Sequence, residues 1–135
     1  MRREPSKSFT NDPEELAREF LDAAKEDLDT VELMKSAGFT ATHNACMLIS
    51  RAAEKFIKAK LLMSGKVQFG HMISLIDSLG EFPGKDRALD IVLFLTPFAT
   101  EANYPSLTRR RIDAEMAQVA YDYLIELIEI IRPFD

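Results

Sequence analysis

Five glycines, at positions 38, 65, 70, 80 and 84, divide the chain into segments whose apolar residues recur every three or four positions. This recurrence is the period of an amphipathic helix, and glycine favours helix ends over helix interiors. None of the five glycines falls inside a segment with the helical period. The helix-breaking glycines thus fall between the segments with helical spacing. This agreement predicts an all-α protein, an up-and-down bundle of four or five helices.

The pattern predicts helices over about residues 13–37, 40–64, 71–79, 85–102 and 113–131. The fourth is ambiguous, because Ile91–Leu95 has the composition of a buried strand. The chain offers no second strand to pair with it, so we predict a helix, kinked or broken near Pro97. Residues 1–12 are polar and are predicted to form a flexible tail before a single domain at residues 13–132.

Composition limits the classes of partner. A length of 135 residues is typical of one domain, and a net charge of −5 argues against a surface that coats nucleic acid. Cys46 is the only cysteine, which fits a reducing, cytoplasmic compartment. The longest apolar run, Ile91–Phe98, is far shorter than the roughly 20 residues that span a bilayer, so no membrane contact is expected. His43 and His71 have no neighbouring ligand set, so neither a metal nor a cofactor is expected.

The last predicted helix is apolar on more than one face, which indicates burial on more than one side. It is either the central helix of a monomer or the seam of a homodimer, and the small size of the domain favours the homodimer. The residues concerned are Leu124, Ile125, Leu127, Ile128, Ile130 and Ile131.

Four short motifs, in order along the chain, resemble the HEPN domain family. The segment Ala52–Ala59 resembles the AAEKxxKA core of that family's second helix, and Ala24–Leu28 resembles the A-x-x-DL of its first. Gly65 followed by His71 resembles the passage into its short third helix. Glu101–Pro105 resembles the E-A-R-Y-P that follows its fourth.

The resemblance implies a helical bundle that is commonly dimeric. It also implies a nucleotide ligand, or a partner of the minimal nucleotidyltransferase type encoded beside the chain, in some cases as a toxin–antitoxin pair.

Some members of the family are ribonucleases that carry Arg-x(4–6)-His. That motif is absent, because positions 36–38 before His43 and 64–66 before His71 contain no arginine. The chain therefore resembles the non-catalytic branch. It also departs from the family pattern at Arg51, where glutamine is usual, and at Asn103, where arginine is usual.

Arg51, Lys55 and Lys58 follow one another at helical spacing, so they share one face of the second helix. Their charges and donors suit a phosphate. The alternative is that they pair with carboxylates of the first helix, for which we consider Asp22, Glu26 and Asp27, or face water.

Four further residues are weaker candidates for a nucleotide or phosphate site. His71 opens a short helix, where it either contacts a ligand or caps and packs the helix end. Tyr104, held by the proline after it, either stacks on a base or packs its ring. Arg109 and Arg110 precede the last helix. They either bind an anion together with the backbone amides of the helix N-terminus, or point outward.

Three functional hypotheses follow. The first is a non-catalytic HEPN-type module that binds a nucleotide or a nucleotidyltransferase. The second is a degenerate ribonuclease or toxin that uses Lys66, His71 and the arginine run. The third is a structural dimer whose last helix is the interaction surface.

Overall fold

The computed structural model describes residues 12–66, 70–101 and 112–132, and these ranges contain helices but no strand. The helices are α1 (Pro13–Ser36), α2 (Thr42–Met63), α3 (Met72–Ser78), α4 (Lys85–Leu95), α5 (Phe98–Glu101) and α6 (Ala114–Ile131). The prediction of an all-α fold is confirmed. The helix predicted to be kinked or broken near Pro97 is broken there: α4 ends before Pro97 and α5 begins after it.

Aspartate caps mark the start of two helices, and a glycine turn ends α1. Asp12 caps α1, its carboxylate accepting a hydrogen bond from the Glu14 amide at 3.1 Å. Asp113 caps α6 in the same way, with the Met116 amide at 2.9 Å. After α1, Gly38 has a positive φ of 80° and the Phe39 amide reaches back to the Met34 carbonyl at 2.8 Å. This is a Schellman ending, which requires the left-handed conformation that glycine adopts readily.

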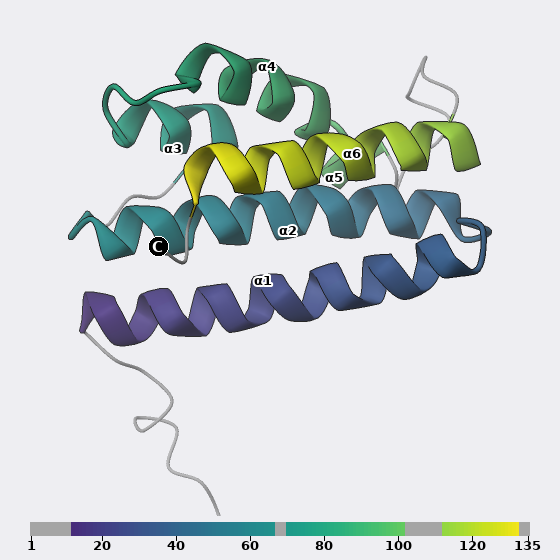
Figure 1. Cartoon of the computed structure of the whole chain (residues 1–135), viewed down its shortest axis with the longest axis horizontal. Coiled ribbons are helices and arrows are strands. Elements are labelled where there is room, and N and C mark those ends of the chain that lie inside the picture. Colours follow the sequence, from purple (N-terminus) through teal and green to yellow (C-terminus); the bar gives the residue numbers. More distant parts are fainter. Residues whose placement is uncertain (1–11, 67–69, 102–111, 133–135) are drawn as a thin grey trace, which may run out of the picture.

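The helices pack around α2, which contacts each of the other five helices (Figure 1). α1 packs along one side of α2, and α6 packs along the other. α3 and α4 pack against each other and against α2, and α4 also contacts α6. One hydrophobic core includes residues from all six helices.

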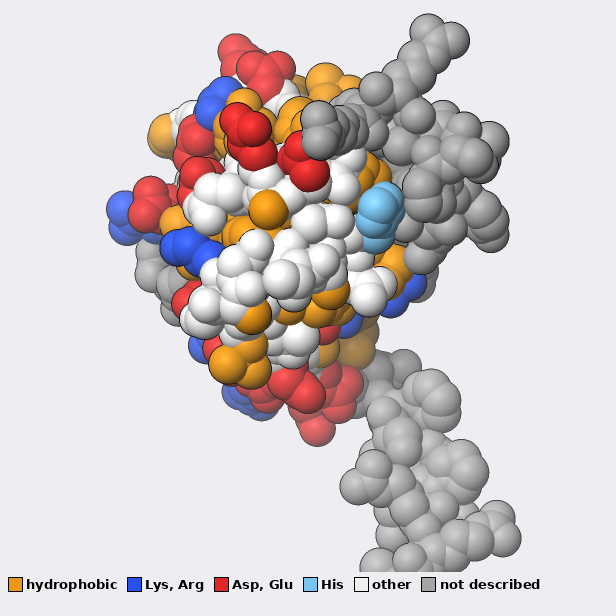
Figure 2. Space-filling model, turned by 90° about the vertical axis from the view of Figure 1, so that its right-hand side faces the viewer, with side chains coloured by type: hydrophobic (Ala, Val, Ile, Leu, Met, Phe, Trp, Pro, Cys, Tyr) orange, Lys and Arg blue, Asp and Glu red, His pale blue; other side chains and the backbone are white. Residues whose placement is uncertain are grey.

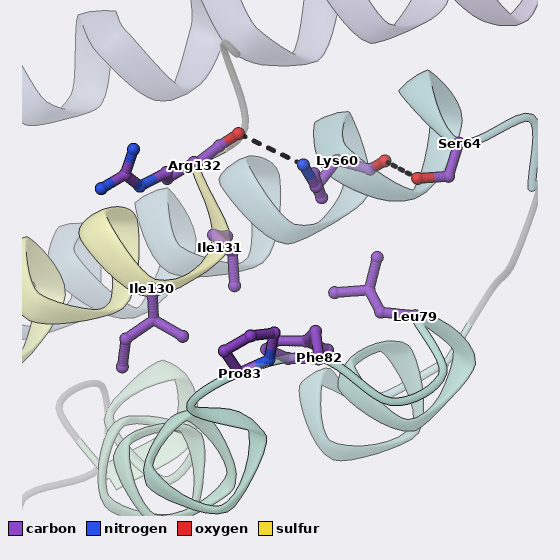
Figure 3. Close-up of a pocket in the computed structure, with 8 residues that line it drawn as sticks. All are labelled: Lys60, Ser64, Leu79, Phe82, Pro83, Ile130, Ile131 and Arg132. Carbon is purple, nitrogen blue, oxygen red and sulfur yellow. Dashed lines mark hydrogen bonds between the residues drawn. The ribbon is translucent and has the colours of Figure 1, made fainter.

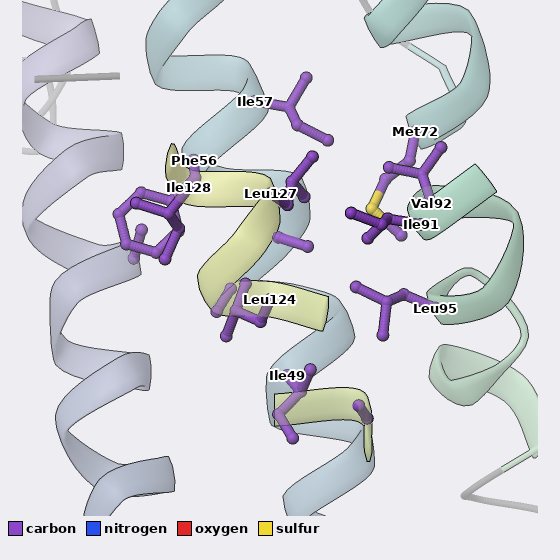
Figure 4. Packing of buried hydrophobic residues seen from close by; sticks show 14 of the residues in the cluster. Ile49, Phe56, Ile57, Met72, Ile91, Val92, Leu95, Leu124, Leu127 and Ile128 are labelled. Carbon is purple, nitrogen blue, oxygen red and sulfur yellow. The ribbon is translucent and has the colours of Figure 1, made fainter. Parts of the chain in front are cut away.

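α6 is buried on more than one side. Leu124, Leu127, Ile128 and Ile131 are all buried. In Figure 4, Ile128 lies beside Phe56 on the side of α6 nearest α1, and the α4 side chains lie on the opposite side. Packing against α2 and α4 therefore accounts for the buried part of the wide apolar surface of α6. Ile125 and Ile130 are only half-buried, and the homodimer stays a prediction.

No helix within the described ranges combines the length and apolar character that crossing a bilayer requires.

Candidate functional site

The predicted basic residues of α2 do share one side of the helix. We call Arg51, Lys55 and Lys58 the basic ridge. Arg51 is exposed, whereas Lys55 and Lys58 are half-buried. The lysine stems can cover apolar surface while their ammonium groups stay near water.

Both lysines of the ridge have carboxylate partners. The Lys55 ammonium lies 2.7 Å from the Asp27 carboxylate of α1, so it joins the first two helices. The Lys58 ammonium lies 3.2 Å from Glu54, one turn earlier on the same helix. It also lies 5.7 Å from the centre of the Phe20 ring, within range of a cation–π contact.

Pairing with the first helix, considered above as the alternative to phosphate binding, is thus found for Lys55. Of the three carboxylates considered, Asp27 is its partner, while Asp22 and Glu26 are exposed. The two partnered carboxylates reduce the three cations of the ridge to one net positive charge. A ligand with several negative charges would be attracted only weakly by one net positive charge, unless it displaced Asp27 or Glu54.

A shallow depression of about 220 Å³ lies beside the ridge. Its lining is mostly apolar and combines side chains of α1 with one lysine of α2. The lining residues are Leu16, Glu19, Phe20, Ala23 and Lys55.

His71 holds the N-cap position of α3, but its side chain makes no capping hydrogen bond and the residue is exposed. The predicted capping role of the ring is therefore not found. Lys66 donates a hydrogen bond of 2.7 Å to the Ser78 carbonyl at the other end of α3. A helix of seven residues is about 10 Å long, so the Lys66 ammonium and His71 lie at opposite ends of it.

Three of the predicted site residues, Tyr104, Arg109 and Arg110, lie outside the described residues. Within the described ranges no three His, Cys, Asp or Glu side chains come together as metal ligands.

The sequence reasoning missed a larger pocket of about 380 Å³, where the C-terminal ends of α2 and α6 meet the turn between α3 and α4 (Figure 3). Its polar residues are Lys60, Ser64 and Arg132, and its apolar residues are Leu79, Phe82, Pro83, Ile130 and Ile131. The position of Lys60, nine residues after Arg51, places it on the opposite side of α2 from the basic ridge.

Figure 2 looks at the end of the bundle where α1 turns into α2. Over the described atoms, hydrophobic side chains are scattered among charged and uncharged polar ones, with no broad apolar patch on that face. The face therefore lacks the contiguous apolar surface by which an interaction site is often recognised.

The described residues define an all-α helical bundle whose central helix carries a charge-compensated basic ridge. The model of the HEPN domain family matches residues 17–133, and the chain belongs to that family. TT1696 from Thermus thermophilus has a similar crystal structure, with a TM-score of 0.68, 22% identity and coverage of 86% of this chain and 95% of that one. ST0689, an archaeal HEPN homologue, gives a TM-score of 0.66 and 23% identity, covering 86% of this chain and 94% of that one. A search of curated proteins gave no match.

Proposed function

We propose that this chain is a non-catalytic HEPN-type module whose basic ridge binds a protein partner, and that the partner is a minimal nucleotidyltransferase. The observation that carries this proposal is the charge compensation of the ridge by Asp27 and Glu54. A surface of matched charges beside half-buried apolar side chains suits a protein better than a polyphosphate, because complementary charges on a protein give register and specificity.

The assignment as non-catalytic has two supports. The sequence has no Arg-x(4–6)-His. Lys66, which has the right spacing to substitute for that arginine, hydrogen-bonds to the Ser78 carbonyl, away from His71. A cation and an acid–base group must both reach the same scissile phosphate. We expect total RNA to remain uncut by the wild-type chain; cleavage that disappears in a His71→Ala variant would contradict the assignment.

The partner proposal is tested by co-expressing the tagged chain with a minimal nucleotidyltransferase encoded beside it. The expected result is a complex of defined stoichiometry in size-exclusion chromatography with light scattering. Arg51→Glu should weaken that complex at least tenfold, since each 1.4 kcal/mol of lost charge complementarity is a factor of about ten.

Lys60→Glu is the matched control, because it makes the same charge reversal on the opposite side of the same helix. It should leave the affinity unchanged. Absence of any complex, or equal weakening by the two variants, would contradict the proposal. The same chromatography, on the chain alone at several concentrations, tests the homodimer that the sequence predicts.

Nucleotide binding at the ridge is a second candidate, favoured by one observation. The Phe20 ring borders the depression beside the ridge and has the Lys58 ammonium near its face, so a base and a phosphate would find neighbouring contacts. Titration with labelled AMP, ATP and GTP tests it. Saturable binding that Lys58→Ala weakens and Lys60→Ala does not would support it, and the absence of saturable binding would remove it.

A further inference from the structure

We infer that the groove between α1 and α2, beside the basic ridge, is the docking site for a basic amphipathic helix of a partner protein. The inference rests on the proposed function, because the groove lies where that function places the partner, and it adds which kind of element binds there. Three features carry it: a second stripe on α1, the depression beside the ridge, and the charges along the groove.

α1 has two stripes at helical spacing, but it packs along only one other helix of the described ranges. The first stripe is buried against α2 and consists of Ala17, Leu21, Ala24 and Val31. The second stripe lies beside the first, is only half-buried, and consists of Leu16, Phe20, Ala23, Asp27 and Met34. Two adjacent stripes suit a helix with two neighbours. In Figure 1, α1 lies at the edge of the bundle with α2 beside it.

The second stripe has the length and spacing that a docked helix requires. From Leu16 to Met34 it runs about 27 Å, at about 1.5 Å per residue. Apolar anchors at three- and four-residue steps are the pattern by which a groove holds an amphipathic helix. Asp27 interrupts the stripe, but its carboxylate lies 2.7 Å from the Lys55 ammonium and needs no charge from the partner.

The depression in the groove has the size of one side chain. Its volume of about 220 Å³ lies below the roughly 300 Å³ at which small-molecule sites begin. Leu16, Phe20 and Ala23 line it from α1, and Lys55 lines it from α2. Interfaces are commonly anchored by one large side chain in such a pocket, so we expect an apolar side chain of the partner helix to fill it.

The charge of α1 selects a basic helix. α1 contains eight acidic and three basic residues, so its net charge of −5 equals that of the whole chain. Glu19 and Glu26 are exposed and each precede a member of the second stripe, so they follow the outer side of the groove. Within the described residues no ion pair neutralises either carboxylate. Lysines or arginines beside the apolar face of the partner helix would complement them.

The same charge argues against a second copy of the chain as the occupant. Two α1 helices packed in this groove would bring their Glu19 and Glu26 carboxylates together, and like charges side by side destabilise an interface. The homodimer that the sequence predicts uses the last helix and leaves this groove open.

Three synthetic peptides of about 18 residues, the length of the second stripe, are the probes. The first is helical, with leucine at three- and four-residue steps and lysine and alanine elsewhere. The second has glutamate in place of lysine, and the third has the composition of the first without its apolar stripe. Each carries a fluorophore and is titrated with the full chain, with anisotropy as the readout. We expect saturable binding of the first peptide and at least tenfold weaker binding of the other two.

Three variants locate the bound peptide. Ala23→Gln fills the depression and should weaken the first peptide at least tenfold. Glu26→Lys should weaken it about fivefold, whereas Asp90→Lys, the same charge reversal at an exposed position of α4, should leave it unchanged. If Ala23→Gln fails to fold, the comparison of Glu26→Lys with Asp90→Lys decides the outcome.

Several results would overturn the inference: no saturable binding of the first peptide, equal binding of the first and either other peptide, or equal effects of Glu26→Lys and Asp90→Lys. A dimer that Ala23→Gln dissociates in light scattering would place a second copy in the groove and also overturn it. If the nucleotidyltransferase complex forms but the basic peptide does not bind, the proposed function stands without this docking site. If the peptide binds and the complex does not form, the docking site stands without that partner.

Discussion

Replacing Leu127 by alanine tests whether α6 is enclosed by its own chain. Leu127 is fully buried, and in Figure 4 it lies between α2 on one side and α3 and α4 on the other. The substitution removes three carbon atoms from the core, which costs roughly 2.4 kcal/mol in transfer free energy at about 0.8 kcal/mol per carbon. The cavity left behind raises the expected loss to about 3 kcal/mol.

The assay is urea denaturation followed by circular dichroism, with the free energy of unfolding as the measured quantity. All variants are measured at one protein concentration, because self-association would otherwise change the midpoint. Leu93→Ala is the control, since Leu93 is 56% exposed on the outer side of α4 and its loss should cost no more than about 0.5 kcal/mol. A loss below about 1 kcal/mol for Leu127→Ala would refute the packing of α6 described above.

Three further predictions concern single contacts. Gly38→Ala should lower the free energy of unfolding by about 1–2 kcal/mol, because φ at this residue is +80°; an unchanged urea midpoint would contradict it. The hydrogen bond from Arg87 lowers the pKa of Glu126, so the stability that this pair contributes should decline as the pH falls below about 4.5. Urea midpoints measured across pH should show that Arg87→Gln removes this part of the decline. Burial, helped by Glu32, raises the pKa of Tyr121 above 10.0, so stability should fall as the pH rises beyond 10, where the unfolded chain ionises first. An absorbance titration of Tyr121→Phe should lose one ionisation step above pH 10.

The fold could be predicted because its signals are local. A cap such as Asp12 or Asp113 acts on amides two or three residues away, and Gly38 acts within a single turn. These short-range interactions can be read directly from the order of residues. The break at Pro97 is of the same kind, since proline removes a donor at a known position.

The chemistry of the site was only partly predictable. Spacing places Arg51, Lys55 and Lys58 on one face, because each residue turns the helix by about 100°. Spacing does not say which carboxylate of α1 faces Lys55, since this depends on how α1 and α2 are aligned along each other. Asp27, rather than Asp22 or Glu26, is the partner only in that alignment. The charge of the ridge is therefore a property of packing.

The pocket at the end of α2 was not predictable at all. Its residues come from stretches near positions 60, 80 and 130, which no local pattern connects. They meet because α2 is central and packs against α1 on one side and α6 on the other. Cations on a central helix cannot enter either apolar interface, so they must lie along its edges or at its ends. Lys58 lies along one edge and Lys60 at the far end of the opposite side, so one helix offers two separate charged sites with different surroundings.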